Sequence, residues 1–130
     1  MILALRTDKP EAEVHLLAAD GKTIAKHTWV AHRELAATLV PTIQTFLGEQ
    51  DTSTRELTGL LVFSGAGSFT GLRIGATVAN ALAYANNIPI AAGEGQDWIT
   101  DGLSKLKTAK SGDYVVPTYD REPNITKPKR

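Results

Sequence analysis

The chain has 130 residues, with 14 Lys+Arg balanced by 14 Asp+Glu, and it contains no cysteine. This length suits one compact domain, and Leu, Ile, Val and Phe make up about a quarter of the chain, enough to bury a core. The lack of cysteine excludes a disulfide framework, a thiolate metal site, an iron–sulfur cluster and a cysteine nucleophile. Zero net charge gives no general electrostatic attraction to nucleic acid or to an acidic membrane.

Neither a membrane span nor a leader peptide is predicted. No apolar run approaches the roughly 20 residues that cross a bilayer. The first six residues lack the basic start, long apolar stretch and cleavage site of a signal peptide. We therefore expect a cytoplasmic protein that makes no membrane contact.

Three antiparallel strands are predicted in the first thirty residues. Residues 2–5 form a short apolar run. Residues 12–18 and 22–30 flank an Asp-Gly pair at Asp20 and Gly21, which is the strongest short signal for a hairpin.

The spacing of the apolar residues then changes to a helical period, and residues 31–47 are predicted to form an amphipathic helix. Leu35, Leu39, Ile43 and Leu47 recur every four residues, and Gly48 is well placed to end the helix. Pro41 should bend or split it, because proline removes a backbone hydrogen bond. A polar loop at 50–55 precedes residues 57–63, an almost continuously apolar run typical of a strand covered on both faces.

The second half continues the α/β alternation. We expect a helix over 72–84 with a left-handed Asn cap at 86–87, a strand over 88–92 and a helix over 96–107. A turn at 111–113 leads to a possible edge strand over 114–119, and residues 124–130 read as a loose tail. The whole predicts a mixed five-stranded sheet with helices on its faces, a single domain over 1–112 and a terminal segment over 113–130.

A glycine-rich turn from Ser64 to Gly71 follows the buried strand and opens a helix. Its glycines permit positive φ, and Ser68 or Thr70 can cap the helix. Backbone N–H groups at a helix N-terminus favour an anion, while Arg73 in the first turn calls for a carboxylate, a phosphate or a partner. The spacing matches neither the dinucleotide fingerprint nor the Walker pattern, so a connection that binds nothing remains an alternative. The candidate site residues are Gly65, Gly67, Ser68, Phe69, Thr70, Gly71 and Arg73.

The string Gly-x-Gly-Ser-Phe-Thr-Gly-Leu-Arg-Ile-Gly, from Gly65 to Gly75, resembles the signature of the TsaB (YeaZ) family. Further likeness lies in the hairpin and in four short segments: Ile2-Leu3-Ala4-Leu5, Leu39-Val40-Pro41, Ile88-Pro89-Ile90 and the run from Val116 to Pro123. The resemblance spans roughly residues 1–95 and 115–125.

This resemblance implies an actin/Hsp70-like (ribonuclease H-like) half-fold and a subunit without catalysis of its own. Family members act in the synthesis of threonylcarbamoyladenosine (t6A) on tRNA. They pair with TsaD, the threonylcarbamoyl transferase, through two helices that map here to 31–47 and 72–84, and the small ATPase TsaE joins the pair. The sequence departs from the family where Arg6-Thr7-Asp8 replaces the usual Asp-Thr-Ser/Ala, and where most of the second domain is missing.

The same two helices carry the predicted interface. Gly75, Ala79 and Ala83 form a stripe of small residues, which serves either close packing on the protein's own sheet or a partner helix. The full predicted interface is Leu35, Leu39, Ile43, Phe46, Ile74, Gly75, Val78, Ala79, Leu82 and Ala83. We expect Ala79→Arg or Ala83→Arg to abolish pairing while the monomer stays folded, and the chain to form a homodimer when its partner is missing.

No complete catalytic or metal constellation is expected. His15, His27 and His32 read as surface residues, and no ligand spacing predicts a metal or other cofactor. Asp97 and Asp101 lie one helical turn apart. They are interpreted either as an acid/base pair or as part of a solvated helix face. The two tryptophans read as core or interface residues. Contact with tRNA would be indirect, and the main alternative is a small nucleotide-binding ATPase or phosphotransferase that uses the glycine-rich turn.

Overall fold

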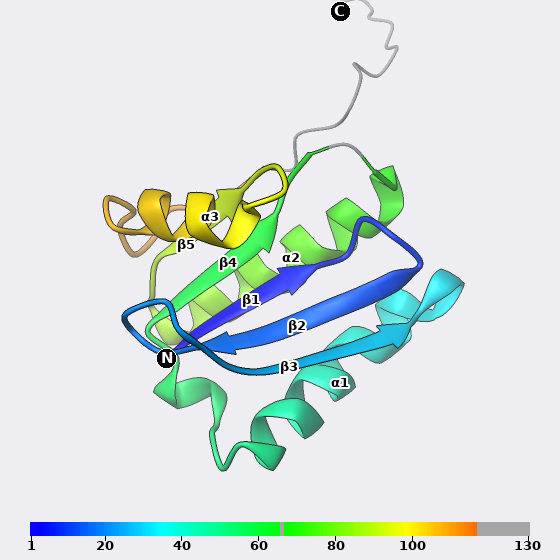
Figure 1. The fold of residues 1–130 in the computed structure, drawn as a ribbon, viewed down its shortest axis with the longest axis horizontal. Helices are drawn as coiled ribbons and strands as arrows, with labels where there is room; N and C mark the ends of the chain where they lie inside the picture. Colours follow the sequence, from blue (N-terminus) through cyan, green and yellow to red (C-terminus); the bar gives the residue numbers. More distant parts are fainter. Residues whose placement is uncertain (66, 117–130) are drawn as a thin grey trace, which may run out of the picture.

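The computed structural model describes residues 1–65 and 67–116. In them, a five-stranded sheet of order β3-β2-β1-β4-β5 carries helices on both faces (Figure 1). The strands are β1 (Ile2–Arg6), β2 (Glu11–Leu17), β3 (Thr23–Val30), β4 (Gly59–Phe63) and β5 (Ile90–Gly93). The helices are α1 (Leu35–Glu49), α2 (Phe69–Asn86) and α3 (Trp98–Leu106), with short 3₁₀ turns η1 (His32–Glu34) and η2 (Thr54–Glu56). The predicted α/β class and mixed five-stranded sheet are confirmed.

Both kinds of strand pairing are present. β2 pairs antiparallel with β1 and β3, whereas β4 pairs parallel with β1 and β5. The hairpin turns at Gly21, whose φ of 92° favours glycine, and Asp20 Oδ1 accepts a hydrogen bond from the Lys22 N–H at 3.0 Å. The predicted three antiparallel strands and Asp-Gly turn are therefore confirmed.

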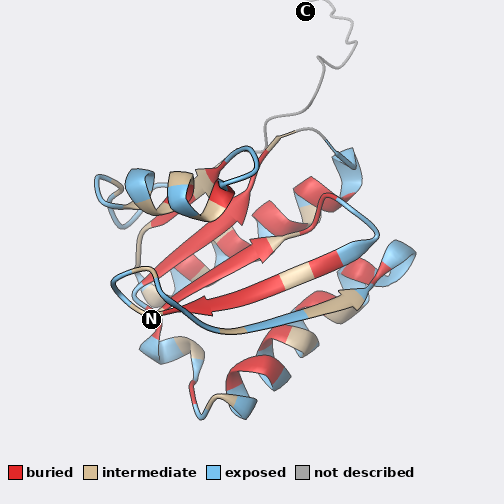
Figure 2. Ribbon diagram, in the orientation of Figure 1, coloured by how far each residue is buried: buried red, intermediate tan, exposed pale blue. Residues whose placement is uncertain are grey.

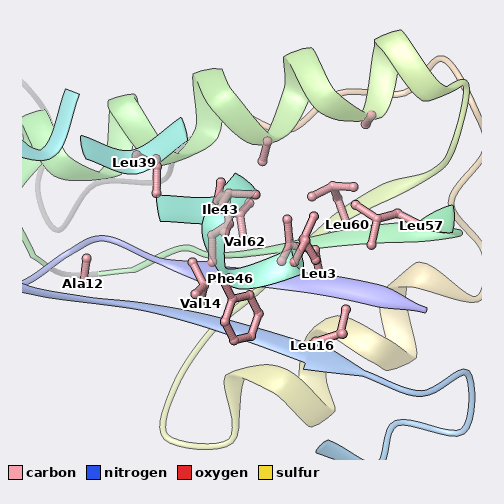
Figure 3. Close-up of a cluster of buried hydrophobic side chains, with 14 of the residues drawn as sticks. Leu3, Ala12, Val14, Leu16, Leu39, Ile43, Phe46, Leu57, Leu60 and Val62 are labelled. Atoms are coloured by element: carbon pink, nitrogen blue, oxygen red, sulfur yellow. The ribbon is translucent and has the colours of Figure 1, made fainter. Parts of the chain in front are cut away.

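Side chains alternate between the two faces of the sheet, as the strand period of two requires. On one face, Leu3 and Leu5 of β1 join Leu60 and Val62 of β4 in the larger core. α1 and α2 cover this face, and Figure 3 shows Leu39, Ile43 and Phe46 of α1 reaching toward the strands.

On the opposite face, α3 packs on β4 and β5. Its Trp98 is buried and meets the Phe63 ring edge-on, with centroids 5.9 Å apart. Ile2 and Ala4 complete this smaller core. β3 forms the sheet edge and is largely exposed (Figure 2).

α1 differs from its predicted form in three ways. It begins at Leu35 after the η1 turn, it runs through Pro41 as one helix, and it contains Gly48. Leu39 and Ile43, on either side of the proline, are buried in the same core. Anchoring both halves in one core offsets the lost hydrogen bond, so the helix is not split.

α2 begins at Phe69, three residues before its predicted start, because Ser68 caps it. It ends at Asn86, and Asn87 adopts the left-handed conformation with φ 54° and ψ 48°. The predicted Asn cap is therefore confirmed.

The predicted edge strand at 114–119 is wrong for the part that the structure describes. Residues 114–116 are not in a strand, because the Asn80 side chain takes both backbone groups of Val115. The rest of that strand and the predicted tail lie outside the described residues. Among residues 1–65 and 67–116, no helix combines the length and apolar character needed to cross a bilayer.

Candidate functional site

The glycine-rich turn packs against the segment that follows β1. The Ser68 N–H donates to the backbone oxygen of Asp8 at 3.0 Å. Ser68 Oγ accepts a hydrogen bond from the Gly71 N–H at 3.1 Å, which satisfies one of the free donors at the start of α2. Ser68 is therefore the cap, and exposed Thr70 is not.

Two glycines within α2 allow the helix to approach the end of β1. A Cβ atom on Gly71 would collide with the backbone oxygen of Thr7, and one on Gly75 would collide with the Thr7 hydroxyl group. That hydroxyl donates to the backbone oxygen of Gly71 at 2.8 Å, and Thr7 is buried. These two glycines are explained by packing within the chain and require no ligand.

The carboxylate nearest the turn is already paired. Arg6 Nε donates to Asp8 Oδ1 at 2.8 Å, and Arg6 Nη2 donates to Asp8 Oδ2 at 3.2 Å. The Arg6 guanidinium also stacks 3.9 Å above the Phe63 ring. Asp8 is 7 % exposed, and the Arg6 guanidinium of the same chain neutralises its carboxylate.

The prediction that Arg73 lies in the first turn of its helix is wrong. Since α2 begins at Phe69, Arg73 lies one turn further on, where the unfavourable effect of the helix dipole has faded. Its guanidinium lies 5.7 Å from the centroid of the Phe69 ring.

A hollow of about 890 Å³ lies between the turn and the start of α1. Its lining includes Thr7, Ser68 and Thr70, with Lys9 and Arg33 as cations and Glu34 as an anion. The charges are mixed, and Ser68 is already engaged as the cap. The nucleotide-binding alternative therefore stays a prediction.

The surface prediction for His15 is wrong, because this residue is 6 % exposed. Its Nε2 donates to Glu13 Oε1 at 2.9 Å, and its ring packs edge-on against Trp98. Burial raises the pKa of Glu13, but the hydrogen bond and charge of His15, with Lys26 and Lys9, lower that pKa below its ordinary value overall. The pair stabilises the polar part of this sheet face, whereas His27 and His32 are exposed as predicted.

The two aspartates of the α3 region do not form an acid/base pair. Asp101 accepts hydrogen bonds from Lys105 Nζ at 2.8 Å and from the Glu94 N–H at 2.9 Å. These bonds, that of Lys105 above all, hold the pKa of Asp101 below its ordinary value. In the part of the chain that the structure describes, no three His, Asp or Glu side chains gather into a potential metal site.

Most of the predicted interface residues face the protein's own core, which corrects the choice of helix face. The stripe of small residues lets α2 approach the sheet closely, and α1 packs beside α2 on the same face of the sheet. The buried members are Leu35, Leu39, Ile43, Phe46, Gly75, Ala79 and Ala83. Ile74, Val78 and Leu82 are half-buried and remain at the surface.

The outer surface of α1 and α2 has very little charge. The 15 residues of α1 contain one charged side chain, Glu49, and the 18 residues of α2 contain one, Arg73. Exposed apolar groups include Val40 (43 %) on α1 and Phe69 (48 %) on α2. A shallow groove with Ala36 on its α1 side runs along Ile74 and Val78. The predicted interface already includes Ile74 and Val78, but sequence reasoning missed Ala36 and Val40 on the α1 side, although the two charge-poor stretches signal this face.

Comparison with known proteins agrees with this architecture. Residues 27–92, half of the chain, match the family model described as TsaD: tRNA N6-adenosine threonylcarbamoyltransferase. The chain is 33 % identical over 125 residues to the tRNA threonylcarbamoyladenosine biosynthesis protein TsaB of Bacillus subtilis, covering 91 % of this chain and 54 % of the relative. It is 29 % identical to TsaB of Escherichia coli, covering 95 % and 56 %.

Solved structures give the same result. YeaZ from Pseudomonas aeruginosa superposes with a TM-score of 0.65 at 31 % identity, covering 72 % of this chain and 43 % of that one. Fold and relatives together define an α/β protein of the actin/Hsp70-like class, as predicted. Within that class, the chain belongs to the TsaB (YeaZ) family. It spans about half the length of the curated TsaB relatives from these two bacteria.

Proposed function

We propose that this chain is a cytoplasmic, non-catalytic subunit in the synthesis of t6A on tRNA, and that it pairs with a TsaD-like transferase. The names of its relatives support the pathway. A TsaE-like ATPase would join the pair, and tRNA would be contacted only through the partner. In the absence of that partner, the same surface would form a homodimer.

The observation that carries this proposal is the charge-poor outer surface of α1 and α2. Surfaces of soluble domains usually carry charged side chains, whereas interface cores are depleted in them. Here Val40 on α1 and Phe69 and Ala81 on α2 are exposed apolar side chains. Each of the two adjacent helices carries only one charged residue. Two helices from a partner that packed against this pair would meet one charged side chain on each helix, Glu49 on α1 and Arg73 on α2.

The test is co-purification of the chain with the TsaD-like subunit encoded in the same genome. Ala81→Arg places a charge on the exposed strip of α2, and we expect it to abolish co-elution. Ser104→Arg on exposed α3, on the other face of the sheet, is the matched control and should leave pairing intact. If both variants paired equally well with the TsaD-like subunit, the proposed interface on α1 and α2 would be contradicted.

Two further measurements separate the alternatives. The mass of the chain in solution, with and without the transferase, distinguishes the heterodimer from a homodimer. Calorimetry with ATP and Mg²⁺ tests the phosphotransferase alternative, for which micromolar binding by the isolated chain would be the supporting result.

A further inference from the structure

A groove between α1 and α2 opens on the charge-poor outer surface of the two helices. It has a volume of about 370 Å³, and its lining includes Ala36 on α1 with Ile74 and Val78 on α2. Ala36 is exposed, whereas Ile74 and Val78 are half-buried and pack against the larger core. The core therefore fixes the α2 wall of the groove, and the small side chain of Ala36 leaves the space between the helices open.

One cation lies at this groove. Arg73 is part of the lining, and its side chain is exposed. Its guanidinium is 5.7 Å from the centroid of the Phe69 ring, within the range of a cation–π contact. In the part of the chain that the structure describes, no carboxylate forms an ion pair with Arg73. The positive charge therefore has an aromatic neighbour but no anion.

The one carboxylate of the two helices lies elsewhere. Glu49 is the last residue of α1, and it lines a different hollow together with His27 of β3. Helix geometry places Glu49 about 20 Å along the axis from Ala36 and about 140° around it. Glu49 is therefore too far from the groove to neutralise Arg73.

A partner that covers the groove would take the Arg73 guanidinium out of water. A buried charge is tolerated where an opposite charge and hydrogen bonds compensate it. Neither α1 nor α2 offers that charge, so the partner must supply it. A second copy of this chain would bring the same two helices, with the same single carboxylate at the end of α1. A partner with an acidic residue of its own therefore suits this groove better than a second copy.

The groove and the cation together define what the partner must present. Interfaces are held mainly by a few side chains that fill well-packed pockets. We propose that the TsaD-like subunit inserts an apolar side chain between Ala36 and Val78 and pairs a carboxylate with Arg73. The planar guanidinium can donate to both oxygens of that carboxylate. This inference rests on the proposed function, because it names the groups through which the partner occupies the same surface.

The inserted side chain is tested by filling the groove. Ala36→Phe occupies the space with a ring of the chain itself and should weaken binding to the TsaD-like subunit about tenfold. Ala37→Phe is the matched control, because it adds the same ring at the next exposed residue, outside this groove, and should leave the affinity unchanged. Surface plasmon resonance gives the affinities, and thermal unfolding midpoints check that both variants fold.

The carboxylate is tested by the salt dependence of the same binding. Arg73→Gln should weaken binding about tenfold at low salt, and its affinity should fall less steeply than that of the unaltered chain as NaCl is added. Arg55→Gln, at an exposed arginine outside the groove, should behave like the unaltered chain. Arg73→Glu should abolish binding, and an Asp→Lys or Glu→Lys change at the facing carboxylate of the TsaD-like subunit should restore it.

The outcomes separate this inference from the proposed function. Equal affinities of Ala36→Phe and Ala37→Phe would overturn the inserted side chain. Equal affinity and salt dependence of Arg73→Gln and Arg55→Gln would overturn the paired carboxylate. In both cases the unaltered chain still binds, so the proposed function would stand. If the unaltered chain did not bind the TsaD-like subunit, the proposed function would be contradicted and this inference with it.

Discussion

The two faces of the sheet differ in how completely helices cover them. α1 and α2 cover one face, where the side chains from β1, β2 and β4 are all apolar. On the other face α3 packs on β4 and β5, and β2 carries the Glu13–His15 pair beside the Trp98 ring. On the fully covered face, the solvent therefore meets the charge-poor outer side of α1 and α2. On the partly covered face, the polar side chains belong to the sheet itself.

This difference shows which side of a helix that is apolar nearly all round packs on its own sheet and which side could bind a partner. Gly75, Ala79 and Ala83 look like a partner-binding stripe, but the helix uses them to approach its own sheet. What distinguishes the outward side is the scarcity of charge, with Arg73 alone on α2. The positions that test an interface are therefore those on the far side of the helix from the small stripe.

Ala79→Arg should have the largest effect, and the effect should be on folding. Ala79 is 0 % exposed, so the guanidinium would be buried in an apolar core, and we expect a loss of about 3–5 kcal/mol or failure to fold. This reverses the sequence-based expectation of a folded monomer. Urea unfolding followed by circular dichroism is the measurement, with exposed Ala81→Arg as the control that should change stability by less than about 0.5 kcal/mol. Equal stability of the two variants would contradict the assignment of helix faces.

The contact between α2 and the end of β1 can be broken by one methyl group. Gly71→Ala would push a Cβ into the backbone oxygen of Thr7, and we expect a loss of about 1–3 kcal/mol or more. Gly48→Ala is the matched control, because nothing lies within 4 Å of its added Cβ, and alanine should raise helix stability by about 0.5–1 kcal/mol. Opposite signs in urea unfolding are expected. A neutral Gly71→Ala would mean that close packing does not explain this glycine.

Local patterns predicted the order of elements because each has a short-range cause. Asp20-Gly21 fixes the hairpin, and Asn87 ends α2. The local patterns gave a wrong prediction where a contact between distant parts of the chain determines the backbone conformation. Pro41 stays inside one helix because two buried turns flank it, and residues 114–116 avoid strand pairing because Asn80, 35 positions away from Val115, binds that backbone. The glycine pattern located the turn, but only the three-dimensional structure shows that Thr7 fills the space beside Gly71 and Gly75.

A smaller effect is expected at the start of α2, where sequence alone left two candidates for the cap. Ser68→Ala removes the acceptor for the Gly71 N–H and should cost about 1 kcal/mol. Thr70→Ala, at an exposed position in the same first turn, should cost much less, because Ser68 already supplies the cap. Thermal unfolding of the two variants gives the comparison. A larger loss for Thr70→Ala would reverse the assignment.

The partly covered face should contribute a pH dependence through Glu13. Because the pKa of Glu13 is lower in the folded chain than its ordinary value, its stabilising contribution is present above the unfolded-state pKa of about 4.3 and is lost as pH falls through the folded value. The unfolded state binds the proton first on acidification, so stability must decrease in that window. Glu13→Gln should therefore lose less stability than the unaltered chain between about pH 6 and pH 3.5. Exposed Glu11→Gln on the same strand is the control, and urea midpoints at both pH values are the measurement. An identical acid-induced loss in the unaltered chain and in Glu13→Gln would show that the His15 pair does not hold this carboxylate in its charged form.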